Sequence, residues 1–488
     1  MSEMTENLFL ELFGFRSHLL LSPRRQTKKV AQTKVWTSMM IIRIAMCILL
    51  PTATLSLLPS LPPSSSSQLL RKLGQKLDLM GYNIAGVAPF FGVPASVPGV
   101  MIDHKKVDRT PVDIDINDDN IFRIAVLLLT LSVPIRLGDD HSVAARDFLS
   151  NLSKLGLVTA AESGNPKKTT FTPRFHVTPT MSPPCVHLTD LHPVIEHDKN
   201  SVMYIGPDTL AMARNIGCVI DGVVKDSQNR GKIDVLDMCC GSGVQGIIFA
   251  KMLSETHTTQ PYHVTFADVN RRALHFTSLN AALNGLKPTQ SSCILSDVFD
   301  DFPTNNNNLY DLIVANPPYV PVPSLLKDSN GLYVGGGGLD GSEVLRRVLI
   351  GSREKLHEGG KLSIVTEICN PDTLLSNLKR ELRGFCGFVF VNDVVVSPGE
   401  YAKRKSGEQD ALREIWESHL EAQCIRGVSV ALFILKKASG REGVQHTKKG
   451  VQHTKNVAKV FVQKLFSPYD DKAPKVIKET LNNWAGWS

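Results

Sequence analysis

The chain has 488 residues, of which 42% are hydrophobic and 7% aromatic, a composition typical of a soluble globular protein with two or three domains. Its net charge of +7 comes from the two ends of the chain, because residues 1–77 sum to +7, residues 441–488 to +5 and residues 78–440 to −5. The negative charge of residues 78–440 argues against a general affinity of this region for phosphate backbones. Nine cysteines without a Cys-x-x-C pair argue against a zinc ribbon or a disulfide framework and favour a reducing compartment.

Residues 1–77 have the composition of a targeting or disordered segment. After the first eleven residues the segment contains no acid, and several basic residues precede an apolar run, Met39–Leu58. Arg43 and Pro51 interrupt this run, which argues against a membrane span, and a secretory signal would begin nearer the terminus. A basic, Ser-rich and acid-poor segment is typical of organellar transit. We therefore expect a plastid or mitochondrial location, with the cytoplasm as the alternative, and no stable membrane association.

Residues 78–200 predict a small accessory domain for substrate docking. Asp118-Asp119-Asn120 predicts a cap for a helix over 121–129, and apolar spacing predicts a second helix over 142–155. A hairpin is expected after Gly156, from 157–159 and 169–177. Two helices and a hairpin indicate a winged-helix-like α+β domain, for which nucleic-acid binding and simple packing remain open as roles.

Histidines and one cysteine gather before the next domain, in a spacing that matches no zinc pattern, so no metal site is expected. They are His176, Cys185, His187, His192 and His197. A helix through residues 210–213 follows, and Asp208 or Thr209 can cap it.

Three successive strands are predicted to end in acids, at Asp237, Asp268 and Asp297. The first strand leads into a glycine turn with Gly241 and Gly243 and then into an apolar helix, which indicates a nucleotide-binding βαβ unit. Asp268 can accept hydrogen bonds from both hydroxyls of a ribose, and Asp297 is placed to receive an adenine amino group. Together the three acids predict an adenosine pocket.

A further strand stops at Asn316-Pro317-Pro318-Tyr319. The prolines end the strand, and Pro317 keeps Asn316 extended at its carboxyl end, where ligands bind in open α/β sheets. The side-chain oxygen of Asn316 and the carbonyl of Pro317 can each accept an N–H bond, while Tyr319 offers a ring face to a flat amide or base. These residue types predict a site that holds a planar NH2 group with its lone pair toward an electrophile.

The order of these motifs resembles class I S-adenosylmethionine-dependent methyltransferases over roughly residues 200–440. The Asn-Pro-Pro-Tyr signature resembles that of N6-adenine methyltransferases and HemK-type glutamine methyltransferases. The resemblance implies a Rossmann-like α/β fold with a seven-stranded, mostly parallel sheet, and S-adenosylmethionine as the cofactor. The cofactor-binding residues that it implies are Asp237, Cys239, Gly241, Gly243, Asp268, Asp297 and Asn316. The catalytic residues that it implies are Asn316, Pro317, Pro318 and Tyr319.

Cys239 departs from the family pattern, because it stands where members usually have the first glycine, so a tighter turn is expected. Downstream, a glycine run, Gly335–Gly338, and Asp340-Gly341 resemble the HemK type, and the run is interpreted as a flexible lid. The expected remaining elements are a strand over 362–366, a closing antiparallel pair over 388–396 and 428–435, and a solvated helix over 400–421.

The expected domains are a targeting or disordered segment (1–77), an accessory domain (78–200), a methyltransferase domain (201–437) and a mostly disordered tail (438–488). Two near-copies of Gly-Val-Gln-His-Thr-Lys in the tail are too few for a repeat architecture, and Trp484 and Trp487 have no assigned role.

Methyl transfer to a planar nitrogen is the leading hypothesis for function. The negative middle of the chain and the HemK-like glycine features favour a protein glutamine, with a release-factor-like protein as the partner; adenine or guanine of RNA or DNA is the alternative. A noncatalytic S-adenosylmethionine-binding scaffold is the rival of another class, and the intact Asn316–Tyr319 motif argues against it. An NAD oxidoreductase is disfavoured because no residue that would handle a hydride is visible in the sequence. The oligomeric state is left open.

Overall fold

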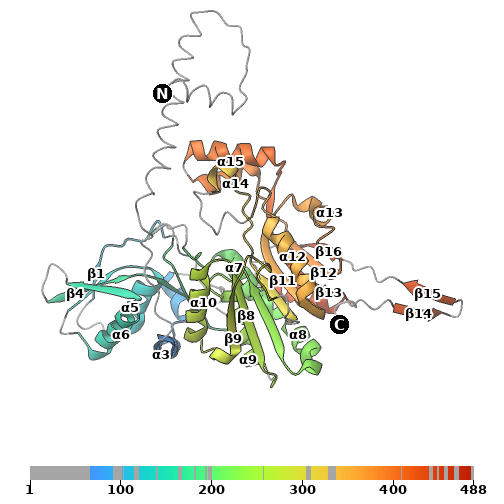
Figure 1. Cartoon of the computed structure of the whole chain (residues 1–488). Helices are drawn as coiled ribbons and strands as arrows, with labels where there is room; N and C mark the ends of the chain where they lie inside the picture. Colours follow the sequence, from blue (N-terminus) through green and yellow to red (C-terminus); the bar gives the residue numbers. More distant parts are fainter. Residues whose placement is uncertain are drawn as a thin grey trace, which may run out of the picture. The chain divides into compact units, whose positions relative to one another are not determined.

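The computed structural model describes most of the chain from residue 66 onward (Figure 1). The described residues are 66–91, 102, 104–114, 120–138, 141–162, 167–180, 183–192, 195, 201–256, 258–303, 309–327, 337–407, 409–438, 443–447, 450–454, 460–465 and 472–484. They all belong to one unit, Leu58–Ser488. Residues 1–65 lie outside them, so the organellar prediction stays a prediction; His197, Gly335, Gly336 and Trp487 also lie outside. Among the residues described, no helix is both long and apolar enough to cross a bilayer.

An eight-stranded sheet in the order β16-β12-β13-β11-β10-β7-β8-β9 forms the centre of the fold (Figure 1). Only the pairs β11–β13 and β12–β13 are antiparallel, so the predicted Rossmann-like, mostly parallel α/β sheet is confirmed. The expected number of seven strands is wrong, because β16 adds a parallel edge strand beside β12. The strands are β7 (Ile233–Met238), β8 (Tyr262–Asp268), β9 (Ser291–Leu295), β10 (Tyr310–Ala315), β11 (Leu356–Cys369), β12 (Phe385–Asn392), β13 (Val428–Lys437) and β16 (Val460–Leu465).

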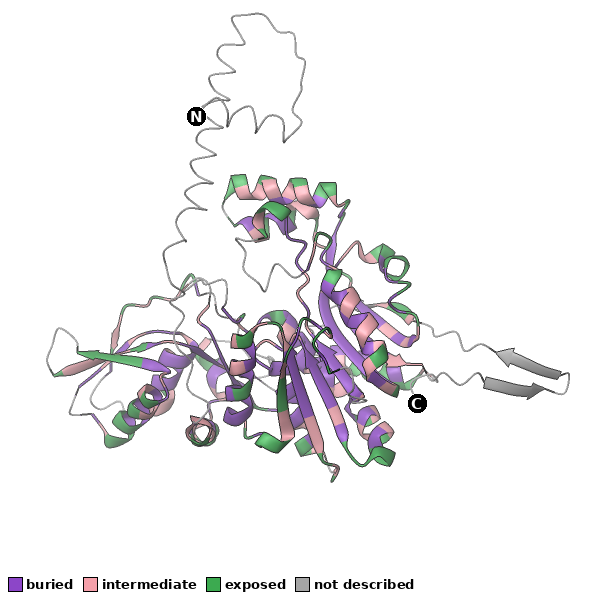
Figure 2. Ribbon diagram, viewed as in Figure 1, coloured by how far each residue is buried: buried purple, intermediate pink, exposed green. Residues whose placement is uncertain are grey.

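Helices cover both faces of the sheet, which is why its central strands read as continuous apolar runs. The central strands of the sheet are mostly buried (Figure 2). Strand β10 is buried at every position, and its side chains alternate between two cores: Leu312 and Val314 join one, Ile313 and Ala315 the other. The first core contains residues of α7 (Pro207–Asn215), α8 (Ile220–Ser227), α9 (Val244–Glu255) and α16 (Ala473–Asn482). The second contains residues of α12 (Glu343–Lys355) and α13 (Leu374–Asn377). Helix α10 (Arg271–Leu283) packs beside β8 and β9.

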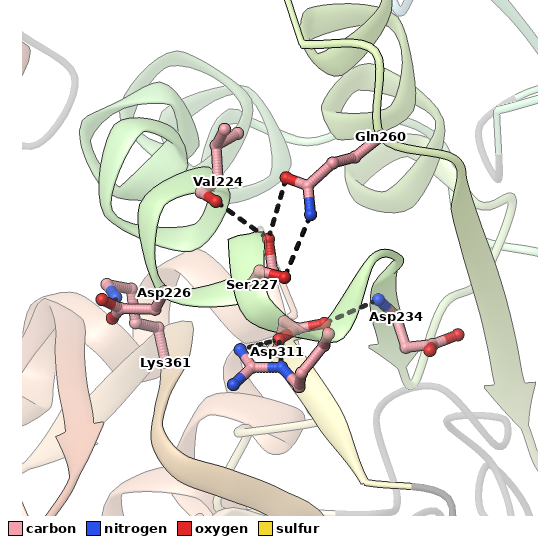
Figure 3. Close-up of polar contacts among 8 residues, drawn as sticks. Val224, Asp226, Ser227, Asp234, Gln260, Asp311 and Lys361 are labelled. Carbon is pink, nitrogen blue, oxygen red and sulfur yellow. Dashed lines mark hydrogen bonds and ion pairs between the residues drawn. The ribbon is translucent and has the colours of Figure 1, made fainter.

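Polar contacts at the amino ends of the strands join α8 to the sheet (Figure 3). Asp311 at the start of β10 accepts hydrogen bonds from the Arg230 guanidinium and from the Asp234 backbone N–H. Lys361 of β11 is 1% exposed and pairs with Asp226; burial lowers the pKa of this lysine. These charges are partnered, as buried charges must be to persist in a fold.

The accessory region combines helices with two small sheets. A four-stranded sheet has the order β1-β2-β4-β3, and β5 pairs with β6 separately. Its strands are β1 (Val112–Asp113), β2 (Ile135–Gly138), β3 (Val158–Glu162), β4 (Lys168–Pro173), β5 (His176–Thr180) and β6 (Cys185–Thr189). Its helical elements are α4 (Ile84–Val87), α5 (Ile121–Ala125), the π-helical turn η3 (Val126–Thr130) and α6 (Val143–Lys154).

The first expected helix begins at its expected cap, because the Asn120 side chain accepts the Arg123 N–H. The second begins where expected, after Ser142, whose side chain accepts the Ala145 N–H. The expected hairpin forms between β3 and β4, but residues 176 and 177 belong to β5 instead. The winged-helix-like character and the docking role stay predictions.

The expected boundary at residue 77 is wrong, because helix α3 (Ser67–Leu79) belongs to the folded unit. Its apolar face, Leu70, Leu73 and Leu77, is buried in one core with residues of α10. Gly74 allows a very close approach: a Cβ atom there would lie 1.9 Å from the Leu283 carbonyl oxygen. The segment before residue 78 therefore contains a structural helix, which composition alone does not reveal.

The expected disordered tail is also wrong for β16 and α16. In α16, Ala473, Ile477 and Leu481 are buried in the core that contains α7 to α9, and Lys478 pairs with Asp221 at 2.8 Å. The Trp484 ring lies 5.4 Å from that of Phe388, which gives this tryptophan a packing role. The two near-repeats form an antiparallel pair, β14 (Gly443–Thr447) and β15 (Gly450–Thr454).

The expected solvated helix over 400–421 is two helices, α14 (Pro398–Ser406) and α15 (Asp410–Ala422). Their charged sequences hide an apolar face: Tyr401 and Trp416 are buried with Val320 and Val322, which follow the Asn-Pro-Pro-Tyr motif. These helices therefore support the backbone of the motif rather than standing in solvent.

Candidate functional site

The carboxyl edge of the sheet brings the predicted motifs together. Val314 of β10 lies beside Asp237 of β7, and β8, which ends at Asp268, is the next strand. Asn316 follows β10 directly. The acids and the amide that sequence places far apart thus end neighbouring parallel strands at one edge.

Asp237 is fully buried and fixes the start of α9. Its Oδ2 accepts a 2.8 Å hydrogen bond from the Gly246 N–H, while its Oδ1 is buried without a hydrogen-bond partner among the described residues. Burial raises the pKa of this carboxyl well above its usual range, and Asp268 nearby raises it further. Asp237 therefore stabilises the turn from a buried position, by holding the backbone at the start of α9.

The turn after Asp237 has three residues with left-handed backbone: Cys239 at φ +55, Gly241 at +54 and Gly243 at +80. A Cβ on Gly241 would meet no atom within 4 Å, whereas one on Gly243 would lie 2.9 Å from Thr277. Gly241 thus faces open space that a ligand can fill, and Gly243 allows the turn to pack on α10. Cys239 adopts a backbone conformation that favours glycine, which costs about 1–2 kcal/mol in a non-glycine residue.

The second residue of the cysteine pair, Cys240, packs against neighbouring side chains in the interior. Cys240 is buried, its Sγ lies 3.5 Å from the Thr277 hydroxyl, and burial raises the pKa of its thiol well above the usual range. A buried, protonated thiol behaves as a small apolar side chain.

Asp268 joins the second strand to the glycine turn. Its Oδ2 accepts from the Gly241 N–H at 2.9 Å and its Oδ1 from the Asn270 N–H at 2.8 Å. Burial raises the pKa of Asp268, against the opposing effect of these bonds. Because each carboxylate oxygen has two lone pairs, both can accept a further hydrogen bond from a diol.

Asp297 stands in a more exposed setting than the other two acids. Its side chain is 56% exposed, and its Oδ1 accepts a 2.9 Å bond from Arg347 of α12. Arg347 also bonds the Asp297 carbonyl and Asp300, so it holds the loop after β9 in place. Nothing in the local sequence marks Arg347 as a partner of this loop.

Asn316 is held in one orientation by the first turn of α7. Its Nδ2 donates to Asp208 Oδ2 at 2.9 Å and to Thr209 Oγ1 at 3.2 Å, so both amide hydrogens are engaged. Tyr319 donates its hydroxyl to the same Asp208 oxygen at 3.0 Å. The Asn316 Oδ1 is buried and has no hydrogen-bond partner among the residues that the structure describes. The amide therefore offers its oxygen to an N–H group of another molecule.

Asp208 and Thr209 were expected to cap a helix, and this interpretation is wrong. The cap is Gly206, because Pro207 takes the first helical position, and Asp208 comes after it. Asp208 is 8% exposed, and its side chain accepts hydrogen bonds from Asn316 and Tyr319. Because Pro207 already begins the helix, Asp208 is not needed as its cap. An acid just after such a proline is the sequence signal that could have indicated a distant partner such as Asn316.

Two glycines pack directly on the motif. A Cβ on Gly337 would lie 2.4 Å from the Val320 carbonyl oxygen, and one on Gly341, at φ +76, 2.3 Å from that of Tyr319. These positions need glycine for close approach to the backbone. The flexible lid stays a prediction, because half of the glycine run lies outside the described residues.

A cavity of about 280 Å³ lies at the opposite, amino edge of the sheet. Four of its polar side chains pair with one another: Lys232 with Asp234 at 2.7 Å, and His263 with Ser292 at 2.9 Å. It lies apart from the predicted motifs and is not assigned to the same site.

The histidine group before the domain forms ring contacts. His104 lies 4.7 Å from His176 and 4.8 Å from His192, centroid to centroid, and His192 lies 4.4 Å from Tyr204. Within the described part of the chain, no group of three or more His, Cys, Asp or Glu side chains is arranged to hold a metal.

Residues 223–326 match the family model of the methyltransferase small domain. The chain is 26% identical over 188 residues to the release factor glutamine methyltransferase of Leptospira interrogans, covering 36% of this chain and 62% of the relative. It is 30% identical over 170 residues to the ribosomal protein uL3 glutamine methyltransferase of Neisseria meningitidis, covering 32% and 52%. A crystal structure of a SAM-dependent methyltransferase from Agrobacterium tumefaciens aligns with 57% of this chain and 77% of that one, at 16% identity and a TM-score of 0.34.

The predicted resemblance to S-adenosylmethionine-dependent methyltransferases is confirmed by the family match and the named relatives. The chain spans between half and two thirds of the length of these two relatives.

Proposed function

We propose that the protein transfers a methyl group from S-adenosylmethionine to the side-chain nitrogen of a glutamine in a protein. The observation that carries the proposal is the Asn316 amide, whose hydrogens are engaged by Asp208 and Thr209 and whose buried oxygen has no partner among the described residues. The names of the relatives, which are glutamine methyltransferases of a release factor and of a ribosomal protein, favour glutamine as the acceptor.

The residues at the carboxyl edge fit the cofactor. Asp268 retains lone pairs for the ribose hydroxyls, Gly241 borders open space, and the charges of Asp237 and Asp297 act on Cys239 of the turn. When bound, S-adenosylmethionine supplies a methyl group that its sulfonium has already activated. The protein is then required mainly to align the acceptor nitrogen with the methyl carbon.

The acceptor side uses the motif as predicted from its residue types. Asn316 Oδ1 accepts one N–H of the acceptor, the Pro317 carbonyl accepts the other, and the Tyr319 ring offers a face to the planar amide. Because Asp208 and Thr209 prevent Asn316 from turning its NH2 toward the acceptor, the site favours a nitrogen that donates over an oxygen that only accepts.

The test is incubation of the full chain with methyl-labelled S-adenosylmethionine and, separately, a recombinant release factor, ribosomal protein uL3 and fractionated cell extract. We expect the methyl label to enter protein. Digestion and mass spectrometry should then locate it on a glutamine. Label in RNA or DNA would replace glutamine by a base as the acceptor. Tight cofactor binding without transfer to any fraction would support a noncatalytic scaffold instead.

Asp268→Ala is expected to weaken S-adenosylmethionine binding by about 1–3 kcal/mol, because the ribose diol loses charged hydrogen bonds and the Gly241 N–H loses its acceptor. Titration calorimetry measures the change. Asp372→Ala is the matched control, since Asp372 is an exposed acid just after β11, at the same edge, and its affinity is expected to stay within threefold of wild type. Equal affinities for all three proteins would remove Asp268 from the site.

Gly341→Ala is expected to lower turnover about 10- to 100-fold, because its Cβ would displace the Tyr319 carbonyl and with it the motif. Gly285→Ala is the control: its φ is +85, but its Cβ meets open space. Gly285→Ala should lose about 1 kcal/mol of stability through backbone strain, and Gly341→Ala should lose more because its Cβ also overlaps the Tyr319 carbonyl; denaturant unfolding measures both. If Gly341→Ala and Gly285→Ala show the same turnover as each other, the contact of Gly341 with Tyr319 has no part in positioning the motif.

A further inference from the structure

The ionisable carboxyl group of Asp208 contacts the nitrogen side of the Asn316 amide, whose oxygen faces the methyl acceptor in the proposed function. Its Oδ2 lies 2.9 Å from Asn316 Nδ2 and 3.0 Å from Tyr319 Oη, and the residue is 8% exposed. Two titratable groups of the described residues interact with it, the Tyr319 hydroxyl and Tyr204. Burial, and then the charge of Asp208, raises the pKa of Tyr204, so this ring stays neutral beside the carboxylate.

Methyl transfer to an NH2 nitrogen creates a proton that must leave. The nitrogen gains a fourth bond and a positive charge, and one of its two N–H bonds has to break. Its acceptors in the proposed pose, Asn316 Oδ1 and the Pro317 carbonyl, are neutral amide oxygens and weak bases. Asp208, which contacts Asn316 on the side away from the acceptor, is a carboxylate and a much stronger base.

We propose that Asp208 takes up this proton through the Asn316 side chain, an inference that rests on the proposed function. The acceptor N–H bond breaks, its electron pair stays on the nitrogen, and the proton bonds to Asn316 Oδ1. In the same step the Asn316 Nδ2–H bond facing Asp208 breaks, and that proton bonds to Asp208 Oδ2. The positive charge on the acceptor and the negative charge on Asp208 cancel, and Asn316 is left as its imidic-acid tautomer.

Asn316 returns to the amide after product release. Asp208 gives its proton back to Nδ2 while the Oδ1 proton passes to solvent, so one proton leaves per methyl group transferred. Before the proton moves, the Asp208 carboxylate also stabilises the positive charge that develops on the acceptor, because charges in a site of low dielectric interact strongly.

Thr209 provides an internal comparison for this role. Its Oγ1 accepts the second hydrogen of the same amide at 3.2 Å, so it orients Asn316 as Asp208 does. A hydroxyl, however, carries no charge and is a poor proton acceptor at neutral pH. Asp208 and Thr209 therefore share the positioning of Asn316, and Asp208 alone of the two can take the proton.

The experiment compares Asp208→Asn, Asp208→Glu and Thr209→Val with wild type, using the protein that wild type labels in the acceptor assay. We expect Asp208→Asn to lower the single-turnover rate about 100-fold or more, the range of acid–base catalysis, with acceptor KM and calorimetric cofactor Kd within threefold. Thr209→Val should lose less than about tenfold, and Asp208→Glu should recover at least part of the rate. Replacing the carboxylate by an amide should also change the pH profile of the single-turnover rate: an acid limb present in wild type should be missing in Asp208→Asn.

Equal losses in Asp208→Asn and Thr209→Val, a loss confined to KM, or a wild-type rate without the acid limb would each overturn the proton role. The wild-type pH profile needs no variant, so it decides even if Asp208→Asn does not fold. Absence of any labelled acceptor with wild type would instead overturn the proposed function and this inference together. Labelling by wild type and Asp208→Asn at one rate would overturn only the inference.

Discussion

Asn316→Ala is expected to abolish turnover while leaving S-adenosylmethionine affinity nearly unchanged. Asn316 follows β10, whereas the acids assigned to the cofactor lie at the ends of β7 and β8 and just after β9. In the proposed function its buried Oδ1 receives the N–H of the methyl acceptor, and misplacing that geometry costs about 100-fold or more in rate. Single-turnover kinetics at saturating cofactor measure the rate, and calorimetry measures the affinity.

Tyr319→Phe and Tyr319→Ala are the matched controls for this prediction. The phenylalanine keeps the ring and loses only the bond to Asp208, so we expect a small effect. The alanine also loses the stacking face, worth about 1–3 kcal/mol per base in nucleic-acid sites, so we expect a larger but still partial loss. A near wild-type rate for Asn316→Ala would mean that the stretch after β10 is only a turn.

A chain that begins at residue 78 is expected to be far less stable than one that begins at residue 66. The shorter chain lacks α3, whose Leu70, Leu73 and Leu77 are buried in the core with α10. Burial of each leucine contributes about 1.5–3 kcal/mol, so the sum approaches the whole stability of a typical domain, about 5–15 kcal/mol. Denaturant unfolding and soluble yield measure the difference. Equal stability of the two chains would mean that α3 does not support the fold.

A point substitution tests the same contact without truncation. Gly74→Ala should destabilise the protein by several kcal/mol, because its Cβ would lie 1.9 Å from the Leu283 carbonyl and backbone must move to make room. Gln75→Ala, at the next and exposed position, should change stability by less than about 0.5 kcal/mol. If both substitutions are neutral, α3 is not docked on α10 as described.

The sequence by itself determined the elements whose signals are local. Residues 312–315 are apolar without interruption because β10 is covered on both faces, and Asn120 and Ser142 cap helices within three residues of themselves. The acids at the ends of β7 and β8 and the prolines after Asn316 follow from where parallel strands stop. These features identify the methyltransferase-like sheet and its carboxyl edge before any long-range contact is known.

Only the tertiary structure decided which residues support that edge. Asp208 and Asn316 are 108 residues apart. The position of Asp208 at the start of a helix predicts a helix cap and not a partner for an amide. Arg347 meets Asp297 across 50 residues, again without a local signal. Side-chain hydrogen bonds between distant segments depend on how the segments pack, so spacing in the sequence does not reveal them.

Composition likewise misled at both ends, because it averages over residues that separate into buried and exposed faces once a helix forms. Helix α3 lies within an acid-poor segment and α16 within a Lys-rich one, yet Leu77 and Ile477 are fully buried. The same applies to α15, where Trp416 stands among charges and packs beneath the helix. A single apolar stripe suffices to dock a helix on an existing core, and whether that core has room for it is decided by the rest of the fold.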